Sequence, residues 1–215
     1  MSTHKYLIAG VDEVGKGWLF GTVFAGAVIL SKTNESKLLS HGLKDSKKLS
    51  QRKRHKLVPL IKENSIAWSL GQASAREIDR IGIREATEKA MIRALEKFLS
   101  PPDLILVDGI LPIRLWPGKQ KTQVRGESHF PSIAAASVLA KEARDELIKR
   151  LAPIYSFYGL EKNKGYGTEI HRTNLIKEGA TRLHRKSFLS RLEIDWLIDW
   201  LIDIYFATNV LYTSY

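Results

Sequence analysis

The stretch Tyr6-Leu-Ile-Ala-Gly-Val-Asp-Glu-Val-Gly-Lys-Gly17 decides the fold of this chain of 215 residues. Residues 6–11 form a short apolar run with β-branched members, which predicts a buried strand. The run leads directly into Asp12-Glu13, and the glycines that follow predict a turn. A second apolar run, residues 23–30, predicts a strand antiparallel to the first. A carboxylate at the end of a buried strand is costly unless it is paired or binds a metal, so this stretch also indicates a candidate site.

Outward from this hairpin, apolar runs alternate with helical periodicity. The expected strands are residues 6–11, 23–30, 66–70 and 104–107. The expected helices are residues 51–63, 83–98, 133–151, 169–177 and a stretch that begins near 189, and residues 31–50 and 110–126 are expected to be loops. Ser50 and Ser132 are the expected N-caps of two of these helices. Strands and helices in this mixture predict an α/β fold with a mixed sheet flanked by helices.

The composition restricts the partners and the compartment. The chain has no cysteine, which excludes disulfides and thiolate metal sites. Its 34 Lys and Arg against 23 Asp and Glu give a net charge of +11, which favours a polyanionic partner. Nucleic acid is the commonest one. An anionic membrane surface is the alternative. The apolar stretch 194–211 is expected to be helical and not to span a membrane, because it carries three aspartates. Without a visible signal peptide we expect a cytoplasmic protein, and we also expect a monomer without a small-molecule cofactor.

Carboxylates recur at places that favour metal binding. Asp108 follows the expected strand 104–107, and Glu127 precedes the helix 133–151. Hard cations such as Mg²⁺ prefer carboxylate oxygens. The alternatives are a solvated turn at Asp12-Glu13 and an ordinary Asp-Gly turn at Asp108. Because adjacent strand residues point to opposite faces, Asp12 and Glu13 can serve one site only if the strand ends or bulges there.

Basic and glycine-flanked segments are candidates for contact with nucleic acid. Asp45-Ser46-Lys47-Lys48 precedes a helix that carries four basic residues, a pattern that fits phosphate binding or a solvated basic face. Tyr166 lies between Gly165 and Gly167, where its ring could stack on a base or sugar or be half-buried in a loop. The spacing of the histidines matches no compact metal-ligand pattern. We interpret His184 and Arg185 as phosphate contacts or as structural residues.

In order, these segments resemble ribonuclease HII, the type 2 ribonuclease H family. The matching segments are collinear over about residues 6–188: Gly10–Gly17, Asp45–Leu49, Val107–Gly109, Gly126–Glu127 with Ser132–Lys141, Arg144–Asp145, Gly165–Thr168, and His184–Arg185 with Ser187–Phe188. The resemblance implies a ribonuclease H-like catalytic domain over residues 1–188. It also implies that a small helical region within this domain, from about residue 152, grips the substrate. Beyond this domain, apolar residues at helical spacing predict that residues 189–215 are an amphipathic helical extension.

The resemblance also implies an activity and a site. It implies endonucleolytic hydrolysis of the RNA strand of RNA–DNA hybrids, leaving 5′-phosphate and 3′-hydroxyl ends. The four carboxylates Asp12, Glu13, Asp108 and Glu127 would hold two Mg²⁺ or Mn²⁺ ions. The segment Gly15-Lys16-Gly17 and Tyr166 would recognise a ribonucleotide by its 2′-hydroxyl. The alternatives are a hybrid-binding protein without catalysis and another phosphoryl-transfer enzyme of the same fold.

Three features depart from the family pattern. Gly15-Lys16-Gly17 replaces glycine-arginine-glycine, Glu127 replaces an aspartate, and about 27 residues follow Phe188. A lysine cannot reproduce the planar fork of a guanidinium. We therefore expect the protein to cleave RNA stretches better than a single ribonucleotide embedded in DNA. The alternative is ordinary ribonucleotide excision, in which Lys16 serves as well as arginine.

Overall fold

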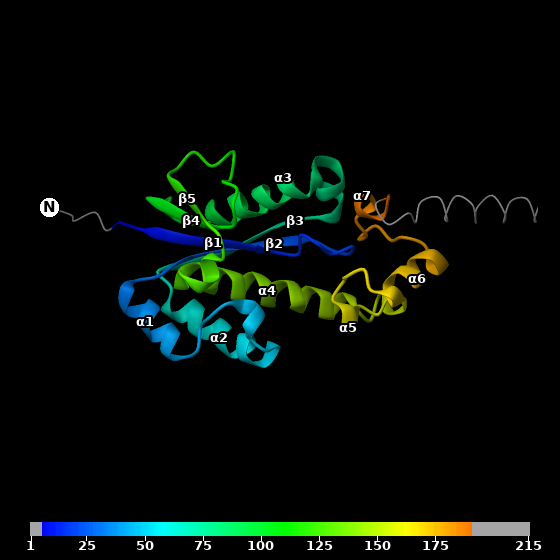
Figure 1. Cartoon of the computed structure of the whole chain (residues 1–215), viewed down its shortest axis with the longest axis horizontal. Helices are drawn as coiled ribbons and strands as arrows, with labels where there is room; N and C mark the ends of the chain where they lie inside the picture. The colour runs from blue at the N-terminus through cyan, green and yellow to red at the C-terminus, as the bar shows by residue number, and fades with distance from the viewer. Residues whose placement is uncertain (1–5, 191–215) are drawn as a thin grey trace, which may run out of the picture.

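The computed structural model describes residues 6–190, in which a five-stranded mixed sheet has helices on both faces (Figure 1). The strands are β1 (Ile8–Val14), β2 (Val23–Ile29), β3 (Ala67–Ala73), β4 (Leu104–Asp108) and β5 (Gln120–Gln123). Their order across the sheet is β3-β2-β1-β4-β5. The first three strands in the chain pair antiparallel, whereas β1 pairs parallel with β4, and β4 with β5. The predicted mixed sheet and the predicted hairpin are confirmed.

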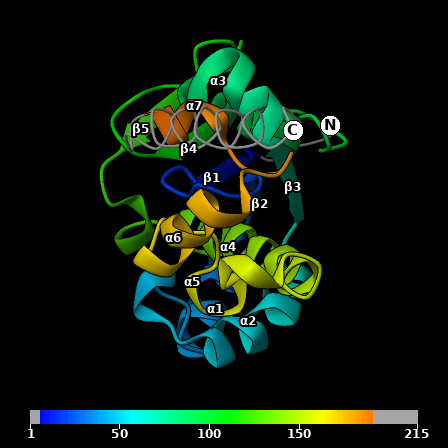
Figure 2. The same ribbon diagram turned by 90° about the vertical axis from the view of Figure 1, so that its right-hand side faces the viewer.

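Helices cover the two faces of the sheet unequally. The helix α3 (Ala75–Leu95) lies on one face, and α4 (Pro131–Leu151) lies on the other, together with α1 (Lys32–Ser40) and α2 (Gln51–Asn64). The short helices α5 (Leu160–Asn163), α6 (Glu169–Glu178) and α7 (Lys186–Leu189) gather at one end of the sheet (Figure 2). Three single 3₁₀ turns, η1 (Ser46–Lys48), η2 (Gly126–Ser128) and η3 (Ser156–Tyr158), complete the described elements. These helices at one end form the small helical region that the sequence predicts.

Small residues bring α4 close to the sheet. A Cβ atom on Gly26 would overlap the backbone of Ala136, and one on Gly10 would overlap the backbone of Ser132 and Ile133. The run of three alanines that begins at Ala134 is fully buried against β1 and β2. Glycine on the strands and alanine on the helix therefore allow a contact that larger side chains would prevent.

Several predicted boundaries are wrong. Residues 31–50 were expected to be a loop, yet they contain α1, whose N-cap Ser31 accepts a hydrogen bond from the amide of Asn34, and η1. Only Leu38 of α1 is buried, so its apolar periodicity is weak. Residues 110–126 were also expected to be a loop, yet they contain β5, whose polar sequence Gln-Lys-Thr-Gln pairs only with β4 at the edge of the sheet. A polar edge strand leaves no hydrophobic pattern.

Two helix ends also differ from the prediction. The helix α4 begins at Pro131 after Phe130, so Ser132 is a buried residue of the first turn and not the N-cap. Proline suits this first position because its missing amide would have no partner there. The helix α3 begins at Ala75 and continues across a kink at Gly82, where φ is 81°. By contrast, Ser50 caps α2 as predicted.

The expected amphipathic extension, residues 189–215, lies outside the described residues from 191 onward. Of the helices within residues 6–190, none combines the length and the hydropathy that crossing a membrane requires.

Candidate active site

Three carboxylates from three separate elements converge beside the interior strands β1 and β4. Asp12 lies on β1, Asp108 ends β4, and Glu127 lies in η2. The parallel pairing of Val11 with Val107 brings Asp12 and Asp108 side by side. Each of the three acids offers an oxygen, and these oxygens lie within 4.8 Å of one another. A group of carboxylate oxygens at this separation is the donor set that a hard divalent cation prefers.

Backbone amides hold these carboxylates in place. The amide of Gly126 donates a hydrogen bond of 2.6 Å to Asp108 Oδ1. The amide of Ser46 donates one of 2.7 Å to Glu127 Oε2, across 81 residues of sequence. The Ser46 hydroxyl also contacts the Ser137 hydroxyl on α4 at 2.9 Å. The turn at Ser46, which the sequence places among the substrate-binding candidates, is therefore attached directly to the acidic cluster.

The acidic cluster concentrates negative charge in a buried place. The side chains of Asp12 and Glu127 belong to residues that are only 3% and 8% exposed. Burial raises the pKa of Asp12 well above its usual value, and the neighbouring charges of Glu13 and Glu127 raise it further. Burial also raises the pKa of Glu127, although the Ser46 amide opposes this effect. Carboxylates that repel one another in this way would gain most from a bound cation.

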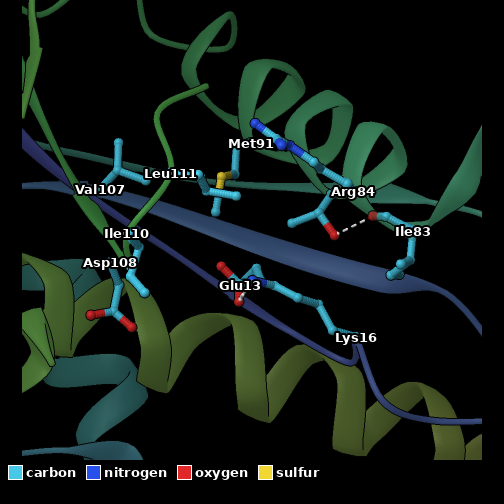
Figure 3. A pocket seen from close by; sticks show the side chains of 11 residues that line it. Glu13, Lys16, Ile83, Arg84, Met91, Val107, Asp108, Ile110 and Leu111 are labelled. Atoms are coloured by element: carbon cyan, nitrogen blue, oxygen red, sulfur yellow. Dashed lines mark hydrogen bonds and ion pairs between the residues drawn. The ribbon is translucent and has the colours of Figure 1, made fainter. Parts of the chain in front are cut away.

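Glu13 lies on the opposite face of β1 from Asp12. The strand neither ends nor bulges at this point but continues to Val14, so the two adjacent side chains diverge. Glu13 lines a cavity of about 560 Å³ together with Lys16, Asp108 and residues of α3 (Figure 3). Its carboxylate pairs with the Lys16 ammonium at 2.5 Å. Burial raises the pKa of Glu13, and Lys16 lowers it.

Glu13 consequently stands beside the three-carboxylate cluster rather than within it. The charge of Asp108 raises the pKa of Glu13, which places the two acids within electrostatic reach of each other. Asp108 belongs to both groups, since it meets Asp12 and Glu127 on one side and lines the cavity with Glu13 on the other.

Basic residues surround the acidic cluster unevenly. The Lys47 side chain is 85% exposed, and its ammonium lies 4.0 Å from Glu127 Oε1. Asp45 accepts a hydrogen bond of 2.9 Å from the Lys47 amide, so Asp45 shapes the turn. Of the basic residues on α2, Arg54 is buried and donates to Asp145 at 2.8 Å. Arg54 thus serves the contact between α2 and α4, whereas the remaining basic residues of this helix face solvent.

The glycine-rich loop, Gly15-Lys16-Gly17, and the segment around Tyr166 lie side by side. The amide of Leu19 donates to the Gly165 carbonyl at 2.9 Å. The ring of Trp18 packs on the Tyr166 ring with centroids 4.4 Å apart, and Tyr166 remains 50% exposed. Gly15 adopts a φ of 104°, which side chains rarely permit. Trp18 was not among the predicted site residues, although a tryptophan next to the glycines is a visible signal.

Of the two interpretations of His184 and Arg185, phosphate contact or a structural role, their surroundings favour the structural one. Both are buried, and Arg185 donates to the backbone carbonyls of Gly21 at 2.9 Å and Lys16 at 3.1 Å. Arg144 lies in a segment that matches the family pattern but was not among the predicted site residues; it is buried and donates to the carbonyls of Lys164 and Phe20. These arginines hold the glycine-rich loop and the Tyr166 segment from inside, because each donates two hydrogen bonds to backbone carbonyls.

The comparisons with known proteins agree with this architecture. A family model described as Ribonuclease HII matches residues 9–191. The chain is 84% identical to the Ribonuclease HII of Prochlorococcus marinus (strain NATL1A) over 195 residues, which cover 91% of this chain and 100% of that protein.

Two solved structures show the same fold. The crystal structure of ribonuclease H2 from Pyrococcus horikoshii OT3 superposes with a TM-score of 0.76 at 23% identity, covering 90% of this chain and 99% of that one. The crystal structure of Bst-RNase HIII in complex with Mn²⁺ superposes with a TM-score of 0.72 at 17% identity, covering 90% and 70%. The family model and the close sequence relative establish the identity: the chain belongs to the ribonuclease HII family and is a ribonuclease H, a hydrolase that cleaves RNA.

Proposed function

We propose that this protein hydrolyses the RNA strand of RNA–DNA hybrids endonucleolytically at the cluster of Asp12, Asp108 and Glu127, with Glu13 beside it. The convergence of three carboxylates from β1, β4 and η2 carries the proposal. In the reaction, the oxygen of a water molecule bonds to the phosphorus while the bond from phosphorus to the 3′-oxygen breaks. The products are a 5′-phosphate and a 3′-hydroxyl.

We propose that Asp12, Asp108 and Glu127, with Glu13 beside them, would hold two Mg²⁺ or Mn²⁺ ions; the convergence of the first three supports this. When bound, such ions would activate the water and stabilise the charge on the leaving oxygen. Asp108 is the residue best placed to bind both ions. It adjoins the other two acids of the cluster, and it also lines the cavity that Glu13 lines. The Mn²⁺ in the structure of Bst-RNase HIII supports this choice of metal for the fold.

The surroundings of the acids suit a nucleic-acid duplex. Lys47 on one side and the exposed basic residues of α2 offer positive charge for phosphates. On the other side, the Tyr166 ring and the backbone of Gly15-Lys16-Gly17 offer a surface for a ribonucleotide. The Asp45-Ser46-Lys47 turn is attached to the acidic cluster through the hydrogen bond between Ser46 and Glu127.

A cleavage assay on three labelled duplexes tests the proposal, with Mg²⁺ and with Mn²⁺. The duplexes are all-DNA, DNA with one embedded ribonucleotide, and a long RNA–DNA hybrid. We expect cleavage of the hybrid, no cleavage of all-DNA, and loss of cleavage by at least about 10²-fold in Asp12→Asn and in Asp108→Asn.

The exposed acid Glu63 on α2 supplies the matched control, and Glu63→Gln should cleave at the unmutated rate. Cleavage of all-DNA would favour a different phosphoryl-transfer enzyme of this fold. Hybrid binding without any metal-dependent cleavage would favour a binding protein. Near-normal cleavage by either aspartate variant would remove that aspartate from the site.

A further inference from the structure

Two histidines meet inside the helical region at the end of the sheet. His171 lies on α6, and His184 lies just before α7. They are 0% and 1% exposed, and their Nε2 atoms are 3.0 Å apart. The rings of Phe20 and Tyr158 pack around His184 at centroid distances of 4.9 Å and 4.7 Å. Neither imidazole has a carboxylate as hydrogen-bond or ion-pair partner among residues 6–190; their partners are backbone groups, the Thr181 hydroxyl and each other.

The partners of the two rings determine where the protons lie. His171 Nδ1 lies 2.8 Å from the Tyr166 carbonyl, which only accepts, so this nitrogen carries a proton. On the far side, the amide of Thr181 donates to His184 Nδ1 at 3.0 Å, so that nitrogen carries none. A neutral imidazole has one N–H group, and therefore His184 Nε2 donates to His171 Nε2.

The result is a directed chain of hydrogen bonds with a single arrangement of protons. It runs from the Thr181 amide through His184 and His171 to the Tyr166 carbonyl. A further proton on either ring would bring two donors face to face, at the contact between the rings or at Thr181. Burial acts in the same direction, because it lowers the pKa of His171 and lowers that of His184 to about 3.

We propose that His171 and His184 are positioning residues that hold the Tyr166 backbone, and with it the exposed ring, where the substrate ribonucleotide is bound. The proposal rests on the role of Tyr166 in the proposed function. Tyr166 follows two residues in the left-handed region, Lys164 and Gly165, so its orientation depends on a tight turn. Its carbonyl accepts from the Thr168 amide at 2.9 Å as well as from His171.

Other groups also anchor the turn, because Arg144 donates to the Lys164 carbonyl at 2.9 Å and Arg172 Nε donates to the Gly167 carbonyl at 2.8 Å. The histidine pair adds the side-chain hydrogen bond that reaches the Tyr166 carbonyl from the core. The Gly165 carbonyl is tied to Leu19 beside the glycine-rich loop, and the Tyr166 ring touches Trp18. The histidine chain connects this turn to Thr181, which lies before α7. A ring displaced by about 1 Å in a substrate site can cost on the order of 10²-fold in rate.

Nitrogen-15 NMR of the full-length chain tests the hydrogen-bond chain without any cleavage assay. Between pH 6 and pH 8 we expect two buried neutral histidines with opposite tautomers. His171 should be protonated on Nδ1 only, and His184 on Nε2 only. The same tautomer on both rings, or a positively charged ring in this range, would overturn the chain.

Kinetics on the long hybrid tests the positioning role. His171→Phe keeps a ring in the core but removes both hydrogen bonds, and we expect kcat/KM to fall about tenfold, mainly through KM. His171→Asn retains an N–H donor near the place of Nδ1, so it should recover part of this loss. The control His41→Gln, at the exposed C-cap of α1, should leave kcat/KM unchanged.

A double-mutant cycle then separates positioning from general destabilisation. If His171 acts through Tyr166, adding His171→Phe to Tyr166→Ala should cause little further loss. Additive losses would overturn the positioning role. If Tyr166→Ala alone leaves kcat/KM unchanged while the hybrid is still cut, then the assigned role of Tyr166 fails and the positioning role fails with it. Absence of all hybrid cleavage by the unmutated chain would instead contradict the proposed function, and the NMR tautomers would still decide the hydrogen-bond chain.

Discussion

At the scale of single residues, Lys16 and Glu127 distinguish this site from the pattern that the sequence resembles. From the sequence, we expect Lys16 to hold a phosphate less precisely than an arginine would. The structure adds that its ammonium is engaged with the Glu13 carboxylate. Glu127, one methylene longer than aspartate, reaches the acidic cluster from η2 while the Ser46 amide holds one of its oxygens. Both substitutions lead to predictions about specificity.

The first prediction concerns Lys16 and the single ribonucleotide. An ammonium paired with Glu13 cannot also hold a phosphate by two parallel bonds as a guanidinium does. We expect kcat/KM for one embedded ribonucleotide to be well below that for a long hybrid, which offers many registers. Lys16→Arg should raise the single-ribonucleotide value several-fold, while Lys37→Arg on α1 should not. Equal values for the two substrates in the unmutated protein would refute this expectation.

The second prediction concerns Glu127 and the metal. Mg²⁺ requires nearly ideal octahedral geometry, whereas Mn²⁺ tolerates a carboxylate that arrives from a greater distance. We expect Mn²⁺ to support at least as much cleavage as Mg²⁺. Glu127→Asp withdraws the carboxylate and also loses the hydrogen bond from Ser46, so the ratio of the two activities should change. An unchanged ratio, measured at saturating metal, would show that the length of this side chain is irrelevant.

At the scale of elements, the close contact of α4 with β1 and β2 positions the site. The helix follows η2 directly, so the depth at which α4 packs determines where Glu127 lies. Gly10 and Gly26 permit this depth, because neither has room for a Cβ atom against the α4 backbone. In the glycine-rich loop, by contrast, packing does not require glycine at position 17, because a Cβ atom on Gly17 would meet only open space.

The third prediction uses this contrast between glycines. Gly26→Ala must push α4 away from the sheet, and overpacking of this kind should cost about 3 kcal/mol. For a domain of this size the melting temperature should then fall by about 6–12 °C. Gly17→Ala, for which there is space, should leave the melting temperature nearly unchanged. Differential scanning calorimetry of both variants decides the matter, and equal shifts would mean that α4 adapts to the larger residue.

At the scale of the whole molecule, the acidic site lowers the stability of the metal-free domain. Buried carboxylates that repel one another are a cost that the core must offset. The pKa of Asp12 is raised in the folded state by burial and by Glu13 and Glu127. The folded state therefore holds a proton on Asp12 more tightly than the unfolded state does. Stability is consequently lost as the pH rises through the raised pKa of Asp12 and is regained as the pH falls.

The fourth prediction follows from this direction. An asparagine side chain in place of Asp12 resembles the neutral acid, so in EDTA at pH 8 the variant Asp12→Asn should melt at a higher temperature than the unmutated chain. The difference should shrink as the pH is lowered. Saturating Mg²⁺ or Mn²⁺ should raise the melting temperature of the unmutated chain more than that of the variant. A variant that is less stable than the unmutated chain in EDTA at pH 8 would contradict the assignment of mutual repulsion.

The sequence by itself determined the features that depend on neighbouring residues. Four apolar runs predicted β1 to β4, and α6 lies close to its predicted bounds, as does α2 after its serine cap. Asp12 and Asp108 were recognisable because each carboxylate follows an apolar run, where burial would be costly without a partner. Glu13, beside Asp12, and Glu127, ahead of a helix, were also candidates from their positions, and the family resemblance implied that the four acids form one metal site. Local pattern suffices here because strand formation and capping involve residues that are close in the chain.

Only the tertiary structure decided the features that depend on distant partners. The polar strand β5 exists because β4 supplies its hydrogen bonds, and Glu13 is separated from Asp12 because β1 remains pleated. Arg185 turned inward because the carbonyls of Lys16 and Gly21, more than 160 residues earlier, accept its hydrogen bonds. The contact between His171 and His184 likewise forms only because α6 and the segment before α7 pack against Phe20 and Tyr158. A buried polar group is stable only where its partner is supplied, and the sequence pattern around it does not reveal which distant segment supplies that partner.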